Sequence, residues 1–125
     1  MDDGVKGLLM GLAEQLYDKH AQDIVALDVA HLTILTESML IVSGRSIPHV
    51  KALHESLEDW LALQGKAPRR REGVREGRWI VLDCEHVIVH IFHEQERGYY
   101  NLERLWMDGA NRINLPFIGN IAVEA

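Results

Sequence analysis

Two short apolar runs, separated by only two residues, place the strongest constraint on how this chain folds. Residues 79–84 (WIVLDC) and 87–92 (VIVHIF) are rich in β-branched and aromatic side chains, with Glu85 and His86 between them. Such runs with so short a connection predict a β-hairpin. Because side chains alternate between the two faces of a strand, both faces of this hairpin carry apolar groups. Each face therefore needs a cover, either helices of the same chain or a partner.

The rest of the pattern supplies helices and two further strands. Apolar residues at helical spacing predict helices over residues 5–20 and 47–64, the second with Ser46 as its N-cap and Pro48 in its first turn. Residues 23–28 and 37–43 are predicted strands, and helical spacing returns at 98–106. The strand–helix–strand unit at 37–84 predicts a right-handed crossover between parallel strands.

These elements predict a single α/β domain, a mixed β-sheet flanked by helices. A chain of 125 residues has the length of one domain. We expect the domain to span residues 1–107, followed by an irregular, loosely attached tail at 108–125, where Gly, Asn and Pro interrupt the pattern.

Composition indicates a cytoplasmic globular protein. The one cysteine, Cys84, excludes an internal disulfide and fits a reducing compartment. The N-terminus is acidic and no apolar run approaches the length of a membrane-spanning helix, so we expect neither secretion nor membrane insertion. The formal charge is −6, yet the loop from Lys66 to Arg78 holds six basic residues against two acidic ones. A globally acidic chain is a poor general binder of nucleic acid, although this loop is suited to a local contact with RNA.

Catalytic signals are weak. His86 and His90 are four residues apart, which on a strand separates them by about 13 Å, too far for one metal ion. Asp83 and Glu85 form an acidic pair at strand spacing, and Gly44-Arg45-Ser46 is a turn of the kind that binds phosphate, a faint nucleotidyltransferase-like combination. Cys84 lies in an apolar run and has no evident base, so we expect no nucleophile, no metal and no cofactor.

The hairpin offers a better candidate. One of its faces carries Trp79, Val81 and Asp83 together with His90 and Phe92. Aromatic anchors with a few polar groups are typical of a protein-binding surface. Helices on both faces of the sheet would leave no such surface, and the sequence alone does not decide between the two.

At this point the sequence resembles the ribosomal silencing factor (Iojap-like) family over residues 5–107. The segments that carry the resemblance are DIVALD at 23–28, GRSIPHVKA at 44–52, Glu72-Gly73, WIVLD at 79–83, VIVHIF at 87–92, and Arg97 with YYNLERLW at 99–106. The resemblance implies a fold similar to that of nucleotidyltransferases without their catalytic motif, and hence no enzymatic activity.

The same resemblance implies a translational repressor, active when nutrients are scarce. Such a factor binds the large ribosomal subunit through its fourteenth ribosomal protein, blocks docking of the small subunit, and is often a homodimer when free. On this chain the apolar centre of the contact would be Trp79, Val81, His90 and Phe92; Asp83 and Glu103 would face a basic partner; and Tyr100 would stand at the rim, with Tyr99 turned to the core. The loop from Lys66 to Arg78 would reach neighbouring rRNA. A metal-dependent nucleotidyltransferase-like enzyme and a homodimerisation module are the alternatives.

Overall fold

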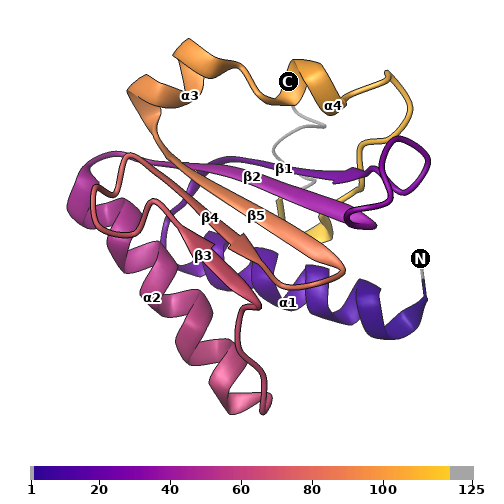
Figure 1. Cartoon of the computed structure of the whole chain (residues 1–125), viewed down its shortest axis with the longest axis horizontal. Coiled ribbons are helices and arrows are strands. Elements are labelled where there is room, and N and C mark those ends of the chain that lie inside the picture. Colours follow the sequence, from indigo (N-terminus) through magenta and orange to yellow (C-terminus); the bar gives the residue numbers. More distant parts are fainter. Residues whose placement is uncertain (1, 119–125) are drawn as a thin grey trace.

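The fold is a five-stranded mixed sheet with two long helices below it and two short ones above it (Figure 1). It was determined as a computed structural model that describes residues 2–118. The strands lie in the order β1-β2-β5-β4-β3. The elements are α1 (Asp3–Asp18), β1 (Gln22–Asp28), β2 (Ser38–Gly44), α2 (Ile47–Leu63), β3 (Arg70–Glu72), β4 (Trp79–Asp83), β5 (Val87–His93), α3 (Glu94–Tyr100) and α4 (Glu103–Trp106). The single-domain α/β fold predicted from the sequence is confirmed.

Local sequence explains where the long helices begin. The Asp2 carboxylate accepts a hydrogen bond from the Val5 amide at 2.8 Å, and the Ser46 hydroxyl accepts one from the His49 amide at 3.1 Å. Each cap satisfies an amide that has no partner within the helix. Both helices bury their leucine-rich faces against the lower side of the sheet, where the larger of two apolar cores lies.

The prediction that the strands flanking α2, β2 and β4, are parallel to each other is wrong. β2 pairs in parallel with β5, whereas β4 is antiparallel to β5 and lies on the far side of it. Burial explains this order. β5 is apolar on both faces and takes an interior position, whereas the side chains of β4 alternate between buried and half-buried. The chain also contains β3, an exposed charged strand of three residues that no apolar pattern announces.

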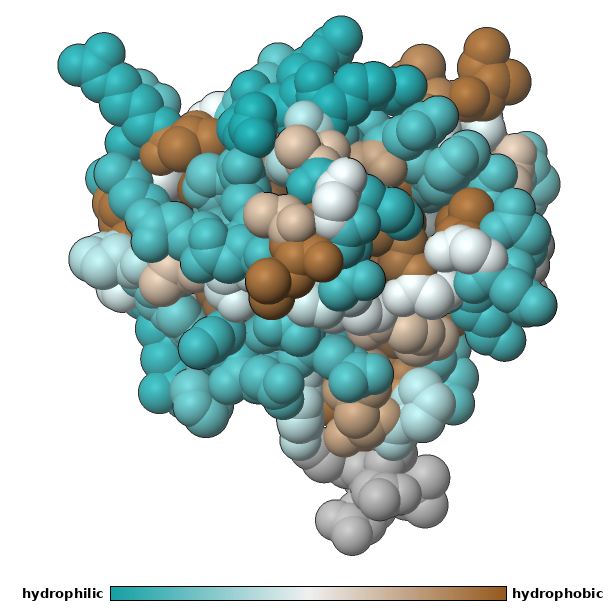
Figure 2. All heavy atoms as spheres, turned by 90° about the horizontal axis from the view of Figure 1, so that it is seen from below, coloured by the Kyte–Doolittle hydropathy of each residue, from teal (hydrophilic) through white to brown (hydrophobic). Residues whose placement is uncertain are grey.

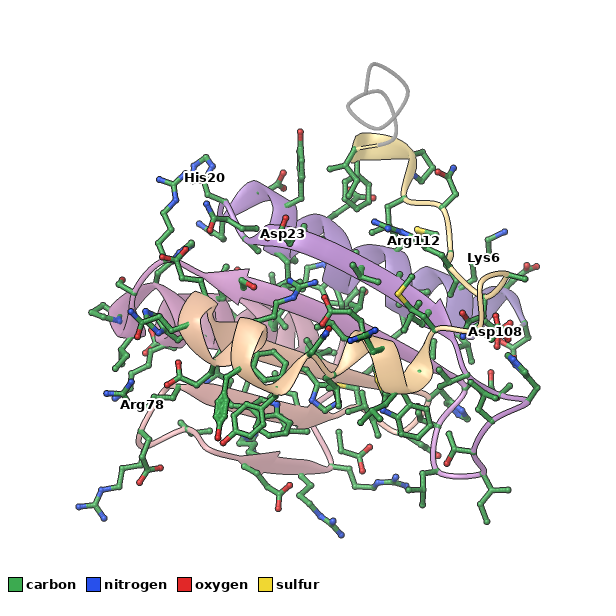
Figure 3. The ribbon with its side chains drawn as sticks, turned by 90° about the horizontal axis from the view of Figure 1, so that it is seen from above. Lys6, His20, Asp23, Arg78, Asp108 and Arg112 are labelled. Carbon is green, nitrogen blue, oxygen red and sulfur yellow. The ribbon has the colours of Figure 1, made fainter. Side chains whose placement is uncertain are left out.

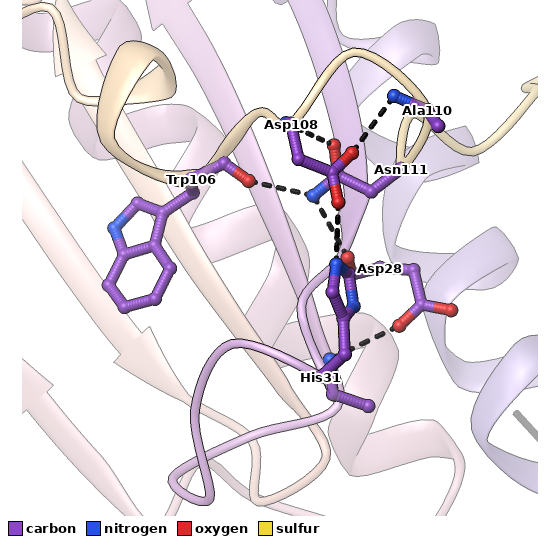
Figure 4. A network of polar contacts seen from close by, with 7 residues as sticks. Asp28, His31, Trp106, Asp108, Ala110 and Asn111 are labelled. Atoms are coloured by element: carbon purple, nitrogen blue, oxygen red, sulfur yellow. Dashed lines mark hydrogen bonds and ion pairs between the residues drawn. The ribbon is translucent and has the colours of Figure 1, made fainter.

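The tail is attached more firmly than predicted. Arg112 forms an antiparallel bridge with Leu27, so this segment covers the free edge of β1. The buried Asn111 side chain donates hydrogen bonds to the backbone carbonyls of Asp28 (3.0 Å) and Trp106 (2.7 Å), as Figure 4 shows. Leu115 enters the lower core. The expectation of a loose tail is therefore wrong for residues 108–118, and residues 119–125 lie outside the described part.

Candidate protein-binding surface

Helices cover the upper face of the sheet only in part. Over β1 and β2, the side chains of Leu102 and Trp106 pack on a second, smaller core. Figure 3 looks down on this face: α3 and α4 lie across its middle, and β4 and β3 extend beyond them. We call the uncovered part the open face; it comprises Trp79, Val81, Ile88, His90, Tyr100 and Leu35. The sequence left open whether helices cover this side. In the structure they cover β1 and β2 but leave part of β4 and β5 exposed.

Trp79 is fixed at the centre of the open face. Its ring stacks on Phe92 with centroids 4.8 Å apart and meets Tyr100 at 5.0 Å. Its indole Nε1 donates a hydrogen bond to Nδ1 of His90 at 3.1 Å. A half-buried tryptophan held on three sides is pre-organised, so a partner would lose little entropy in binding it.

Phe92 does not belong to the accessible surface. Its side chain is fully buried beneath Trp79, in the upper core. It supports the surface from below and makes no direct contact available to a partner. His90 is 8% exposed, and burial lowers its pKa to about 4, so it is neutral near pH 7.

The two acidic residues assigned to partner contact already have partners within the chain. Asp83 accepts from the Arg69 guanidinium at 3.1 Å and from the Glu85 amide at 2.9 Å. Glu103 pairs with Arg97 at 3.0 Å. Their charges are thus largely neutralised locally, and neither presents a free carboxylate to a basic partner.

Tyr99 lies the opposite way from the helical count. It is 77% exposed instead of turned to the core, whereas Tyr100 is 53% exposed and its ring meets that of Trp79. The reason is a break in the predicted helix: α3 ends at Tyr100 and Asn101 is left-handed, with φ of 49°. Residues on either side of that break do not share one helical face.

Sequence reasoning missed three residues of this region. Ile88 shares a face with His90 and was detectable by strand alternation. Leu35 approaches Val81 and Ile88 from the loop before β2, and together they line a hollow of about 230 Å³. Nothing in the sequence places that loop there. Arg97 is 7% exposed and donates to the Ser43 hydroxyl at 3.0 Å, which ties α3 to β2; an arginine gives no signal of burial.

Ion pairs take up half of the cations in the loop from Lys66 to Arg78. Arg69, Arg71 and Arg78 pair with Asp83, Glu58 and Glu96 respectively. By register, Arg70 lies opposite Asp83 and so borders the open face. Lys66, Arg70 and Arg75 form no ion pair within residues 2–118.

The nucleotidyltransferase-like features do not come together. Gly44 lies opposite His93 of β5, whereas Asp83 lies opposite Ile88, five residues away along the same strand. That places the turn and the acidic pair at opposite ends of the sheet, roughly 17 Å apart. Burial raises the pKa of the Cys84 thiol to about 11, so it is not a thiolate near neutral pH. Within residues 2–118, no cluster of three or more His, Cys, Asp or Glu side chains is arranged to hold a metal ion.

The opposite side of the molecule is different in character. Seen from the side of α1 and α2, polar residues cover most of the surface and apolar ones stand in small separate groups (Figure 2). None of the described helices has the length and apolarity needed to cross a bilayer.

Fold and surface together define a small α/β protein with a partly covered sheet whose exposed aromatic side is suited to binding another macromolecule. Comparison then identifies the family: the family described as "Ribosomal silencing factor during starvation" (RsfS) matches residues 4–124, and the chain belongs to it. The resemblance seen in the sequence is confirmed.

Relatives and solved structures agree with this assignment. The chain is 39% identical over 103 residues to the ribosomal silencing factor RsfS of Bacillus subtilis, covering 82% of this chain and 87% of that protein. It is 31% identical to the chloroplastic protein Iojap of Arabidopsis thaliana, covering 94% of this chain and 49% of that protein. A crystal structure of a Chromobacterium violaceum protein superposes with a TM-score of 0.80 at 30% identity, covering 92% and 96% of the two chains.

Proposed function

We propose that this protein is a translational repressor that binds the large ribosomal subunit through its fourteenth ribosomal protein and sterically blocks the small subunit. Family membership supports a role in ribosome silencing. The observation that carries the binding part is the open face, a rigid aromatic surface that residues 2–118 cover only in part. The proposed site of action is the cytoplasm, during starvation.

A steric mechanism needs only occupancy. A standard interface buries about 800 Å² per partner. The open face, together with the exposed Leu105 of α4 and the loop carrying Leu35, offers anchors for such a contact. A protein seated there prevents subunit joining without any chemical step, which fits the absence of a shared site for the turn at Gly44 and the acidic pair.

Charge has a secondary part in the proposal. The overall charge of −6 favours encounter with a basic ribosomal protein and makes the association rate sensitive to salt. By register Arg70 lies at the border of the open face, and we expect it and the loop from Lys66 to Arg78 to contact rRNA next to the protein contact.

Co-sedimentation with purified large and small subunits tests the proposal. We expect selective binding to the large subunit and fewer joined ribosomes. Val81→Glu, which places a charge on the open face, should abolish binding. Leu63→Glu is the matched control, because Leu63 is 83% exposed at the end of α2, away from that face. Absence of binding to large subunits at low salt, or equal effects of the two variants, would contradict the proposal.

Self-association through the same surface is the second candidate. An aromatic face that the described residues cover only in part is suited to binding a second copy of the chain, and we expect a homodimer when the protein is free. Light scattering of the wild type and of Val81→Glu separates the cases. A dimer that Val81→Glu dissociates, with no binding of the wild type to ribosomes, would favour a homodimerisation module.

A further inference from the structure

His90 stands out on the open face because it is a polar group at the centre of an apolar surface. The rings of Trp79 and Phe92 lie against it, and it lies on β5 opposite Val81. A buried polar atom normally has a hydrogen-bond partner. Each of the two ring nitrogens of His90 therefore needs a hydrogen-bond partner or contact with solvent.

The hydrogen bond from Trp79 determines which nitrogen carries the proton. An indole Nε1–H only donates, so Nδ1 of His90 accepts and holds no hydrogen. The neutral imidazole must then carry its proton on Nε2. Burial favours this neutral form, because a charged ring would lose hydration and would place two N–H groups against each other.

The Nε2–H group has no acceptor within residues 2–118. It is nevertheless not sealed inside the protein: in the described part, the one fully buried side-chain atom without a partner is Glu103 Oε1. The Nε2–H of His90 therefore reaches the surface of the open face.

We propose that His90 presents a single, fixed hydrogen-bond donor to the partner, and that the partner segment seated on the open face carries an oxygen acceptor ringed by apolar side chains. This inference rests on the proposed function and deepens it. Trp79 is then both an apolar anchor and the positioning residue that sets the tautomer of His90. A segment without such an acceptor would leave the donor buried and unpaired, which gives the surface a means of discrimination.

The free protein tests the tautomer independently of any partner. In ¹⁵N-labelled protein at pH 7, long-range proton–nitrogen spectra should show His90 protonated at Nε2 alone. Trp79→Phe keeps a stacking ring but loses the donor, so the two tautomers should become mixed. A proton on Nδ1 in the wild type would overturn the proposal.

Binding to large subunits tests the donor. His90→Phe keeps an apolar ring but removes the donor, and we expect affinity to fall about ten- to a hundredfold. His90→Gln returns an amide N–H near the position of Nε2 and should recover part of that loss, even if His90→Phe folds poorly. Equal affinity of wild type, His90→Phe and His90→Gln would refute the role of His90 while leaving the proposed function intact. Failure of the wild type itself to bind would refute the proposed function, whatever the tautomer.

Discussion

Arg97 and Glu103 form an ion pair that joins α3 to α4, with Nη2 and Oε2 3.0 Å apart. The guanidinium side chain is 8% exposed and also donates to Ser43 of β2. The pair therefore holds α3 and α4 over the smaller core. Their position determines which part of the upper sheet face is covered and which part is the open face.

Breaking this pair from one side should be costly. Arg97→Met leaves the Glu103 carboxylate buried without its cation, and we expect a loss of about 3–5 kcal/mol in the free energy of unfolding. Urea denaturation measures it. The double variant Arg97→Met with Glu103→Met removes both charges and should recover much of the loss. A double variant as unstable as the single one would contradict this account of the pair.

Phe92 and Leu35 should respond to substitution in opposite ways. Phe92→Ala empties a fully buried site and should cost about 3–5 kcal/mol of stability. Leu35 is 70% exposed, so Leu35→Ala should change stability by less than about 0.5 kcal/mol while weakening binding to the large subunit. Thermal melts and co-sedimentation of both variants check this. Unchanged binding of Leu35→Ala would remove the loop from the proposed contact.

The difference between Phe92 and Leu35 shows which features of the surface can be predicted from the sequence. Alternation along β4 and β5 correctly predicts which residues share a face. It does not predict that Trp79, the first residue of β4, closes over Phe92, because that depends on where α3 brings Tyr100. Whether a side chain on a sheet face is buried depends on what packs over it in three dimensions. The predicted surface therefore included Phe92, which is fully buried.

The ion pairs of the acidic residues could not be predicted, for a related reason. Asp83 and Glu103 are ordinary acidic residues in the sequence, and their cations, Arg69 and Arg97, come from a loop and a helix whose positions follow from the tertiary fold. The order of β4 and β5 was likewise decided by which strand is apolar on both faces, a comparison between strands rather than a pattern within one.

Acid should destabilise the protein through His90. Its pKa is about 4 in the folded state against 6.5 for an ordinary histidine, so the unfolded chain takes up a proton first as the pH falls. The contribution is fully present well above pH 6.5 and is lost as the pH falls toward 4, and the loss reaches about 2 kcal/mol at pH 5.

Urea unfolding at pH 7 and pH 5 measures this effect as a difference between two proteins. His90→Phe lacks the titrating group, so its stability should fall less between the two pH values than that of the wild type by about 2 kcal/mol. All other ionisable groups are present in both proteins, so their effects cancel in the comparison. Parallel pH dependence of the two proteins would show that His90 is not buried in the neutral form.

Asn111 should be the main attachment of the C-terminal segment. Its amide donates to the carbonyls of Asp28 and Trp106, and its Oδ1 accepts from the Asp108 amide at 3.0 Å (Figure 4). Asn111→Ala leaves these backbone groups without their partner, and we expect a loss of about 2–3 kcal/mol together with faster amide exchange along β1.

His31→Ala is the matched control for that prediction. His31 Nε2 contacts Asp108 Oδ2 at 2.6 Å in the same network, but both side chains are more than a third exposed. An exposed pair of this kind contributes little to stability. Hydrogen exchange of the β1 amides should therefore distinguish the two variants. Equal and small effects would mean that the antiparallel bridge between Leu27 and Arg112, together with the burial of Leu115, is sufficient to hold the segment on the edge of the sheet.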